Sequence, residues 1–340
     1  MSERVAEVFR LEYGRIVASV LRIVRDIDAA EEIAQESFEQ ALDHWPENGT
    51  PDRPGAWLLT TARRRAVDHL RRLRRAGARV GVLAYEVALS GLHEIPDVSD
   101  PEVIPDDRLR LIFTCCHAGL APDSRVALTL RLIGGLTTAE IARAFLVPEP
   151  TIAQRLVRAK RTIRDRGLQY EVPEGAELSE RLPDVLAVVY LIFNEGYAAH
   201  TGEALVRHDL CDEALRLGHM LADLMPSEPE VLGLLALMEL QASRSLTRAD
   251  ARGDLVLLED QDRSRWDRGL IASGCAFLDR AGPMARAGPY QLQAEIAACH
   301  ARADSWAATD WPQIVAHYDA LAAIMPSPVV ALNRAVAIGL

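Results

Sequence analysis

Apolar residues recur every three to four positions along most of this 340-residue chain, and no stretch shows the alternation typical of a β-strand. Ala, Leu and Arg are abundant and aromatic residues make up only 5% of the chain, which also favours helix over sheet. We therefore expect an all-α fold. A chain of this length is long for one hydrophobic core, so we expect two or three domains.

The composition, 49% hydrophobic and 26% charged, is that of a soluble globular protein. The first residues are charged throughout and carry no secretory signal, and the apolar run Val185–Phe193 is too short to span a membrane. Five cysteines without regular spacing suit a reducing compartment. We expect a cytoplasmic protein with no membrane contact.

The charge is divided unevenly along the chain. Residues 1–170 hold 25 basic and 24 acidic side chains, whereas residues 171–340 hold 13 basic and 25 acidic ones. The basic residues of the first half fall mainly into two clusters, Arg53–Arg79 and Arg125–Arg166. Two concentrated basic patches on an acidic protein predict two contacts with a polyanion.

Changes in composition indicate the domain boundaries. Glu94–Asp107 contains three prolines, six acids and no basic residue, which is typical of an extended linker. We expect a helical domain at 1–76, an acidic linker at 77–107, a second helical domain at 108–167 and a helical extension at 178–340.

The segment Leu136–Asp165 predicts a helix-turn-helix. Thr137 and Glu140 form a capping box, "LVPEP" ends the first helix, and an apolar stripe marks the inner face of the second helix: Ile152, Leu156, Ala159 and Ile163. Arg and Gln reach base edges, and Lys and Arg contact phosphates. The polar residues of the second helix that we expect to touch DNA are Thr151, Gln154, Arg155, Arg158, Lys160 and Arg161. A merely solvated helix face is the alternative.

The segment Ala56–Arg75 predicts a second basic helix. Its apolar stripe consists of Leu58, Ala62, Ala66, Leu70 and Leu73. Arginines cover the remaining faces, and Trp57 stands at the start, as in a groove that holds a nucleic-acid strand and stacks its bases. A helix on a membrane surface and a solvated helix are the alternatives. The stripe of Leu and Ala is less bulky than a membrane-surface helix requires.

Together these motifs resemble the extracytoplasmic-function (ECF) sigma factors of bacterial RNA polymerase, in the branch with a C-terminal TPR-like extension. The resemblance covers roughly residues 5–167, and "VYLIFNEGYAA" (Val189–Ala199) looks like the extension of that branch. "AEEIAQESFEQAL" is similar to the sigma motif that binds the β′ clamp helices of core polymerase. That similarity implies a polymerase-binding role for Asp28, Glu31, Glu32, Gln35, Glu36 and Phe38.

The resemblance also implies where promoter DNA binds. The helix at 56–75 resembles the segment that opens and reads the −10 element, which implies −10 contacts for Trp57, Arg63, Arg64, Arg65, Asp68, His69, Arg71, Arg72 and Arg75. Arg64 stands where most members carry Asn. The helix-turn-helix resembles the domain that reads the −35 element and binds the β flap. The acidic linker would, as in the family, pass through polymerase channels.

The C-terminal half shows a repeat, because "LADLMPS" at Leu221–Ser227 returns as "LAAIMPS" at Leu321–Ser327. We expect TPR-like helical hairpins there, most clearly at Gln291–Asp304 and Trp311–Met325. The last helix is apolar and lacks a polar cap, so we expect that the sequence stops short of the natural C-terminus.

No enzyme site stands out. Nucleotide-binding, zinc-protease and hydrolase motifs do not occur in the sequence. Cys115, Cys116 and His117 are adjacent on a helix and therefore point about 100° apart, which suits buried thiols better than a metal site. We expect no enzyme activity, no cofactor and no metal.

The leading interpretation is a sigma factor. The alternative is a stand-alone helix-turn-helix regulator with a TPR sensor domain, which leaves the basic helix and the acidic motif unexplained. The acidic extension suggests a contact with a protein partner or with the basic domains of the same chain, through which it would restrain promoter binding. The other possibility is that the extension is required for activity.

Overall fold

The computed structural model describes residues 2–75, 103–168, 170–197, 208–250, 254–284 and 287–339. Within these ranges the chain is α-helical, with short 3-10 turns and no strand, so the all-α prediction is confirmed. The chain divides into two compact units, Met1–Val188 and Val189–Leu340. None of the described helices is both long and apolar enough to cross a membrane.

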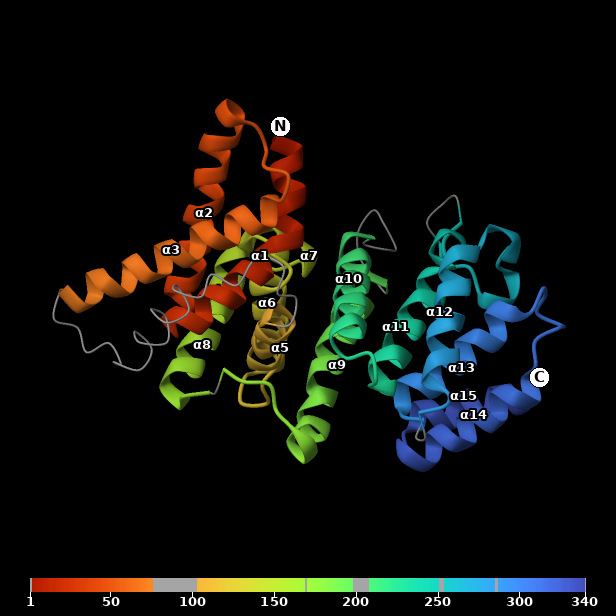
Figure 1. Cartoon of the computed structure of the whole chain (residues 1–340). Helices are drawn as coiled ribbons and strands as arrows, with labels where there is room; N and C mark the ends of the chain where they lie inside the picture. The colour runs from red at the N-terminus through yellow and green to blue at the C-terminus, as the bar shows by residue number, and fades with distance from the viewer. Residues whose placement is uncertain are drawn as a thin grey trace. The chain divides into compact units, whose positions relative to one another are not determined.

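Three helices begin the first unit: α1 (Ser2–Val24), α2 (Ile27–Asn48) and α3 (Pro54–Arg75) (Figure 1). Asp26 caps α2, because its side chain accepts a hydrogen bond of 2.9 Å from the Ala29 N–H. Tyr13, Trp45 and Leu58 are fully buried among the three helices. Pro46 lies inside α2, which continues to Asn48.

The helices described next along this unit are α5 (Val103–Cys115), α6 (Pro122–Leu132), α7 (Thr138–Ala144) and α8 (Glu149–Arg166). Both hydrogen bonds of the predicted capping box at Thr137 are present. Since α5 begins at Val103, the last residues of the predicted linker at 77–107 are helical. The rest of that linker lies outside the described residues.

The two helical sets of the first unit pack directly on each other. A Cβ added to Gly14 of α1 would lie 2.9 Å from the Ile133 carbonyl oxygen at the end of α6, so the two backbones are in close contact. The Tyr170 hydroxyl donates to the carbonyl oxygens of Ala18 at 2.7 Å and of Asp107 at 3.0 Å, which ties α1 to α5.

The helix α9 (Gly175–Tyr197) spans the boundary between the units, and the predicted extension begins within this helix, at residue 178. Its first half packs on the first unit, where Arg125 forms a 2.6 Å ion pair with Asp184. Arg181 donates to the Phe113 carbonyl oxygen at 3.3 Å and lies over the Phe113 ring. These contacts hold residues 178–188, the start of the predicted extension, against the first unit.

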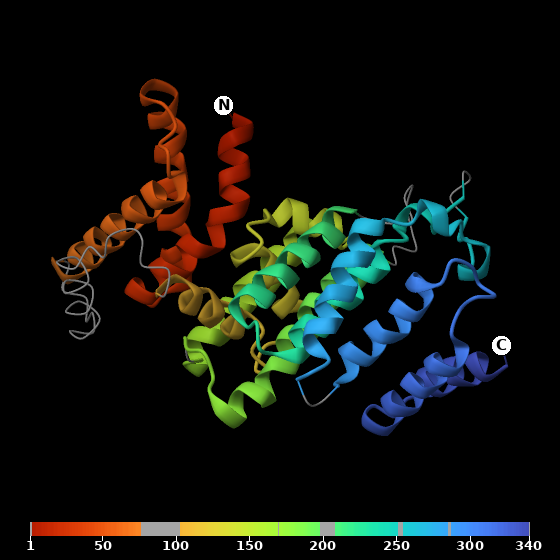
Figure 2. The same ribbon diagram turned by 45° about the vertical axis from the view of Figure 1, so that its right-hand side comes forward.

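The second unit consists of helices that pack on their neighbours in the chain: α10 (His208–Leu224), α11 (Pro229–Ala242), α12 (Arg268–Ala281), α13 (Pro289–Arg302), α14 (Trp311–Ile324) and α15 (Pro328–Ile338) (Figure 2). Three 3-10 turns lie between α11 and α12: η1 (Ser245–Thr247), η2 (Leu258–Asp260) and η3 (Arg263–Arg265).

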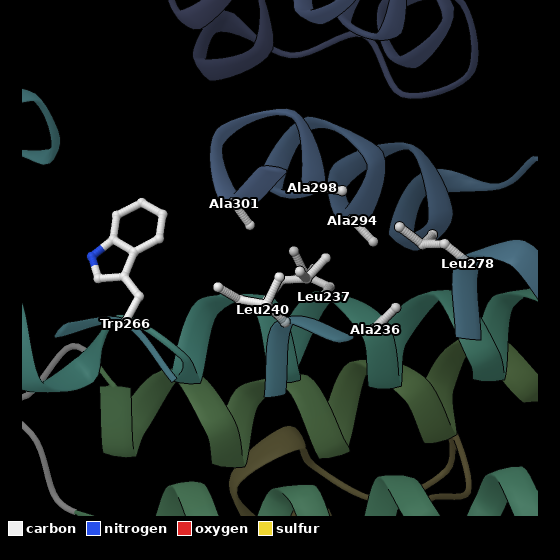
Figure 3. Close-up of a cluster of buried hydrophobic side chains, with 9 residues drawn as sticks. Ala236, Leu237, Leu240, Trp266, Leu278, Ala294, Ala298 and Ala301 are labelled. Atoms are coloured by element: carbon white, nitrogen blue, oxygen red, sulfur yellow. The ribbon is translucent and has the colours of Figure 1, made fainter. Parts of the chain in front are cut away.

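The sequence repeat has a structural meaning in this unit. Each copy ends a helix, α10 or α14, and is followed by a helix with a proline in its first turn, Pro229 in α11 or Pro328 in α15. The predicted hairpin is present as α13 and α14. Figure 3 shows the core between α11 and α13, with Leu237 and Leu240 facing alanines of α13 and Trp266 at one end.

Candidate nucleic-acid and polymerase interfaces

The C-terminal end of α3 projects from the other helices of the first unit (Figures 1 and 2). The buried stripe is as predicted at Leu58, Ala62, Ala66 and Leu70, whereas Leu73 is exposed. Because this stripe is buried, the opposite side of α3 faces solvent. The exposed basic residues of α3, which we call the α3 basic face, are Arg64, Arg71, Arg72, Arg74 and Arg75.

Arg63 and Arg65 lie outside this face. The Nε of Arg63 donates to Ser19 Oγ at 3.1 Å, and burial, followed by the neighbouring Arg22, lowers the pKa of its half-buried guanidinium. Arg65 forms an ion pair with Glu36 and donates to Gln40 Oε1 at 3.1 Å. Both arginines therefore connect α3 to its neighbouring helices.

Trp57 is part of an aromatic group at the start of α3. Its ring stacks on His44 with 5.8 Å between centroids and an interplanar angle of 11°, and it meets Trp45 edge-on at 5.7 Å. Trp57 remains half exposed, whereas Trp45 is buried. The side chain of Trp57 thus has an accessible aromatic surface held in a fixed orientation.

The helix α8 presents two sides to its surroundings. Its predicted inner stripe of Ile152, Leu156, Ala159 and Ile163 is buried. On the outer side Gln154, Arg158 and Arg161 are exposed, and Thr151 is half exposed near the helix start. Arg155 forms a 2.7 Å ion pair with Asp123 of α6. We call Thr151, Gln154, Arg158 and Arg161 the α8 outer face.

The basic residues at the other edge of α8 contact the acidic start of α2. The Lys160 ammonium lies 2.8 Å from Asp28 Oδ1 and also pairs with Glu31, and Arg164 lies 2.9 Å from Asp28 Oδ2. Burial alone lowers the pKa of Lys160, but Glu31 and Asp28 outweigh it and raise that pKa. The ammonium therefore remains charged at this contact.

Glu31 is the most buried carboxylate of α2, with 6% of its surface exposed. Besides Lys160 it pairs with Arg131 of α6, whose Nε lies 2.8 Å from Glu31 Oε1. Arg131 also donates to the Leu136 carbonyl oxygen at 3.1 Å. A buried carboxylate needs such partners. We call Asp28, Glu31, Arg131, Lys160 and Arg164 the α2–α8 ion-pair cluster.

Comparisons with known proteins cover the chain in three parts. A model of sigma-70 region 2 matches residues 8–76, a model of sigma-70 region 4 matches 110–163, and a family of unknown function (DUF6596) matches 181–282. The ECF RNA polymerase sigma factor SigK of Mycobacterium ulcerans is 33% identical over 162 residues, which is 44% of this chain and 79% of that protein. The chain belongs to the ECF RNA polymerase sigma factors.

Other relatives extend the match. SigK of Mycobacterium bovis is 31% identical over 164 residues, 47% of this chain and 83% of that protein. An uncharacterized protein of Rhizobium meliloti is 46% identical over 326 residues, which is 95% of this sigma factor and 76% of the relative, so the similarity there includes the extension. No solved structure matches the chain.

The predicted polymerase-binding residues of this sigma factor occupy three environments. Glu32 and Gln35 are exposed on α2, while Asp28, Glu31 and Glu36 are ion-paired. Phe38 is buried, and its ring packs on Phe9 with 4.7 Å between centroids and on Tyr13 at 6.2 Å. Phe38 therefore supports α2 from within the core and is not available on its surface.

The predicted −10 residues of the sigma factor also include Asp68 and His69. Asp68 accepts a 3.1 Å hydrogen bond from Arg71 one turn later, and His69 is half-buried.

The sequence did not predict a role for Arg131, because nothing in it indicates that α6 approaches α2. Cys115 and Cys116 are buried, as expected, and burial raises the pKa of both thiols. Among the described residues no group of side chains is arranged to hold a metal ion.

Proposed function

We propose that this sigma factor binds core RNA polymerase through the exposed acidic side of α2 and directs initiation at promoters read by α3 and α8. The α3 basic face would contact the −10 element, and the α8 outer face would contact the −35 element. Sigma factor function follows from the family. The assignment of each surface to a polymerase or promoter element is our proposal.

The observation that supports it most strongly is that both DNA-binding candidates are defined by a buried stripe. In α3 and in α8 the apolar stripe fixes the rotation of the helix, so Arg71 and Arg72, and likewise Gln154 and Arg158, must face solvent. Guanidinium and amide groups can bond base edges bidentately, and further arginines neutralise phosphates.

The chemistry required is binding without covalent catalysis. Opening the −10 element costs a few kcal/mol for each unstacked base. Stacking on an aromatic side chain returns about 1–3 kcal/mol per base, and Trp57 offers an accessible ring for this purpose. The arginines of the α3 basic face would hold the backbone of the opened strand.

The α2–α8 ion-pair cluster bears on polymerase binding. An acidic surface recognises a basic partner, yet Lys160 and Arg164 already occupy Asp28 and Glu31 in the free chain. A basic polymerase surface that uses these carboxylates would have to displace α8. We infer that docking on polymerase separates α8 from α2.

A transcription assay tests the proposal. Purified chain is mixed with sigma-free core polymerase and a promoter template, and specific transcript is expected only when both proteins are present. A stand-alone helix-turn-helix regulator, the alternative, would bind duplex DNA by itself and give no transcript with core polymerase alone.

The extension is tested by truncation after Val188, because residues 178–188 pack on the first unit. If the acidic extension restrains promoter binding, the shortened chain will direct at least as much transcription as the full chain. Loss of transcription, with the first unit still folded, would show instead that the extension is required.

A further inference from the structure

The second unit contains a cavity of about 530 Å³ that the sigma function does not use. It lies among α11, α13, α14 and α15, and its size is within the range of small-molecule sites. Its apolar wall includes Leu237, Leu240, Ile296, Leu321 and Val330, each at least nine-tenths buried. Trp266 also lines the cavity.

The polar part of the wall carries positive charge and no negative charge. Gln241, Arg244, Gln293 and His300 line it, and none of the cavity-lining residues is Asp or Glu. Across the part of the chain that the structure describes, no carboxylate lies within ion-pair distance of the Arg244 guanidinium. An arginine without a carboxylate partner is unusual within residues 171–340, which hold 25 acidic and 13 basic side chains.

The surroundings of His300 also carry an excess of positive charge. Its Nδ1 is buried and has no hydrogen-bond partner among the described residues. Burial, followed by Arg244 and Arg263, lowers the pKa of His300 to about 4. Arg263 is itself satisfied, since it donates to the carbonyl oxygens of His300 at 2.7 Å and Ala303 at 2.8 Å. Arg244 is therefore the cation that remains available to a ligand in the cavity.

We propose that this cavity binds a small organic acid with one carboxylate and an apolar chain. The carboxylate would pair with Arg244, and the chain would lie along Leu237, Leu240 and Leu321. A guanidinium pairs well with a carboxylate, and an apolar wall of this size accepts the rest of the molecule. The inference concerns the second unit alone, so its failure would leave the sigma function untouched.

Binding is measured on the full chain with decanoate, and with decan-1-ol as the uncharged probe of the same chain length. Tryptophan fluorescence supplies the signal, because Trp266 lines the cavity. We expect saturable one-to-one binding of decanoate that is about tenfold tighter than that of decanol. Equal affinities, or no saturable binding of decanoate at millimolar concentration, would overturn the proposal.

Three variants locate the site. Arg244→Gln is expected to remove the preference for decanoate over decanol, while Arg265→Gln, an exposed arginine outside the cavity, keeps it. Ala297→Phe places a ring in the cavity and is expected to abolish binding of both probes. Unchanged binding in Ala297→Phe, or the same loss in Arg265→Gln as in Arg244→Gln, would assign the signal to another place and refute the inference.

Discussion

The ammonium group of Lys160 in α8 lies 2.8 Å from a carboxylate oxygen of Asp28 in α2. One residue belongs to the helix proposed to read the −35 element and the other to the helix proposed to bind polymerase. The same contact therefore occupies a basic residue that suits phosphate and an acidic residue that suits polymerase. Lys160 can contact a phosphate, and Asp28 can contact polymerase, only when α8 separates from α2.

The double variant Lys160→Ala/Arg164→Ala is expected to bind core polymerase at least about tenfold more tightly than the wild type, measured without DNA. A charge-assisted hydrogen bond to a group such as Glu31 contributes about 1.5–3 kcal/mol, and the exposed Arg164 pair contributes about 0–1 kcal/mol. Removing both interactions lowers the free energy needed to separate α2 from α8. Fluorescence anisotropy of labelled chain with core polymerase provides the measurement.

Arg161→Ala is the matched control, because Arg161 lies on the same helix and its one ion pair within the described ranges is with Asp165, one turn away. Its affinity for core polymerase is expected to stay at the wild-type value. Weaker binding by the double variant would mean that polymerase recognises the closed arrangement of α2 and α8.

Arg72→Ala/Arg75→Ala is expected to weaken promoter binding by the polymerase complex and to reduce its salt dependence. Each lost phosphate contact on a single strand lowers the slope of log K against log salt by about 0.7. Arg53→Ala, directly before the start of α3 and also exposed, serves as control. A slope unchanged by the double variant would exclude phosphate contacts at the end of α3.

Arg158→Ala is expected to cost about 1–3 kcal/mol in binding to the preferred −35 sequence and to relax the preference at one base pair. Binding of the polymerase complex to templates with single −35 substitutions measures this. Arg166→Ala changes an exposed arginine at the end of the same helix, whose guanidinium donates to the Gly119 carbonyl oxygen. It is expected to affect all templates alike, and a base-specific effect there would argue against the proposed outer face.

The helices were predictable because each carries its own local signals. The capping box at Thr137 and the stripe of Ile152 and Leu156 specify the start and the rotation of their helices without reference to the rest of the chain. The hairpin predicted at Gln291–Asp304 and Trp311–Met325 is likewise present as α13 and α14. Periodicity thus revealed which face of α8 is exposed.

Pairings between distant helices were not predictable. Glu31 and Arg131 are 100 positions apart, and nothing local indicates that α2 and α6 meet. Phe38 belongs to a motif that suggested a binding role, but its ring completes the core with Phe9 and Tyr13. Which residues of a motif lie inside is decided by packing against other helices.

Arg63 and Arg64 are neighbours that the sequence placed in one DNA-binding set, and the structure separates them. Arg63→Ala is expected to destabilise the first unit by about 1–2 kcal/mol, since it removes the half-buried packing of the side chain and its hydrogen bond to Ser19. Arg64→Ala, at an exposed position, is expected to change stability by less than about 0.5 kcal/mol. Urea unfolding of both variants checks this, and equal stabilities would contradict the inward position of Arg63.

His300 makes the stability of the second unit depend on pH. Its pKa falls from 6.5 to about 4 on folding, mainly because of burial. Below pH 6.5 the unfolded chain therefore takes up a proton that the folded chain takes up only near pH 4, and stability is lost between these two values. For a shift of this size the loss at pH 4.5 is about 2.5 kcal/mol.

His300→Phe removes this loss while keeping an aromatic ring beside Trp306 and Trp311. Because Nδ1 of His300 has no partner among the described residues, its replacement is expected to cost less than about 1 kcal/mol at pH 7.5. At pH 4.5 the variant should be more stable than the wild type by about 2 kcal/mol. Urea unfolding at both pH values measures the difference, and parallel pH profiles for the two proteins would show that His300 is not the group responsible.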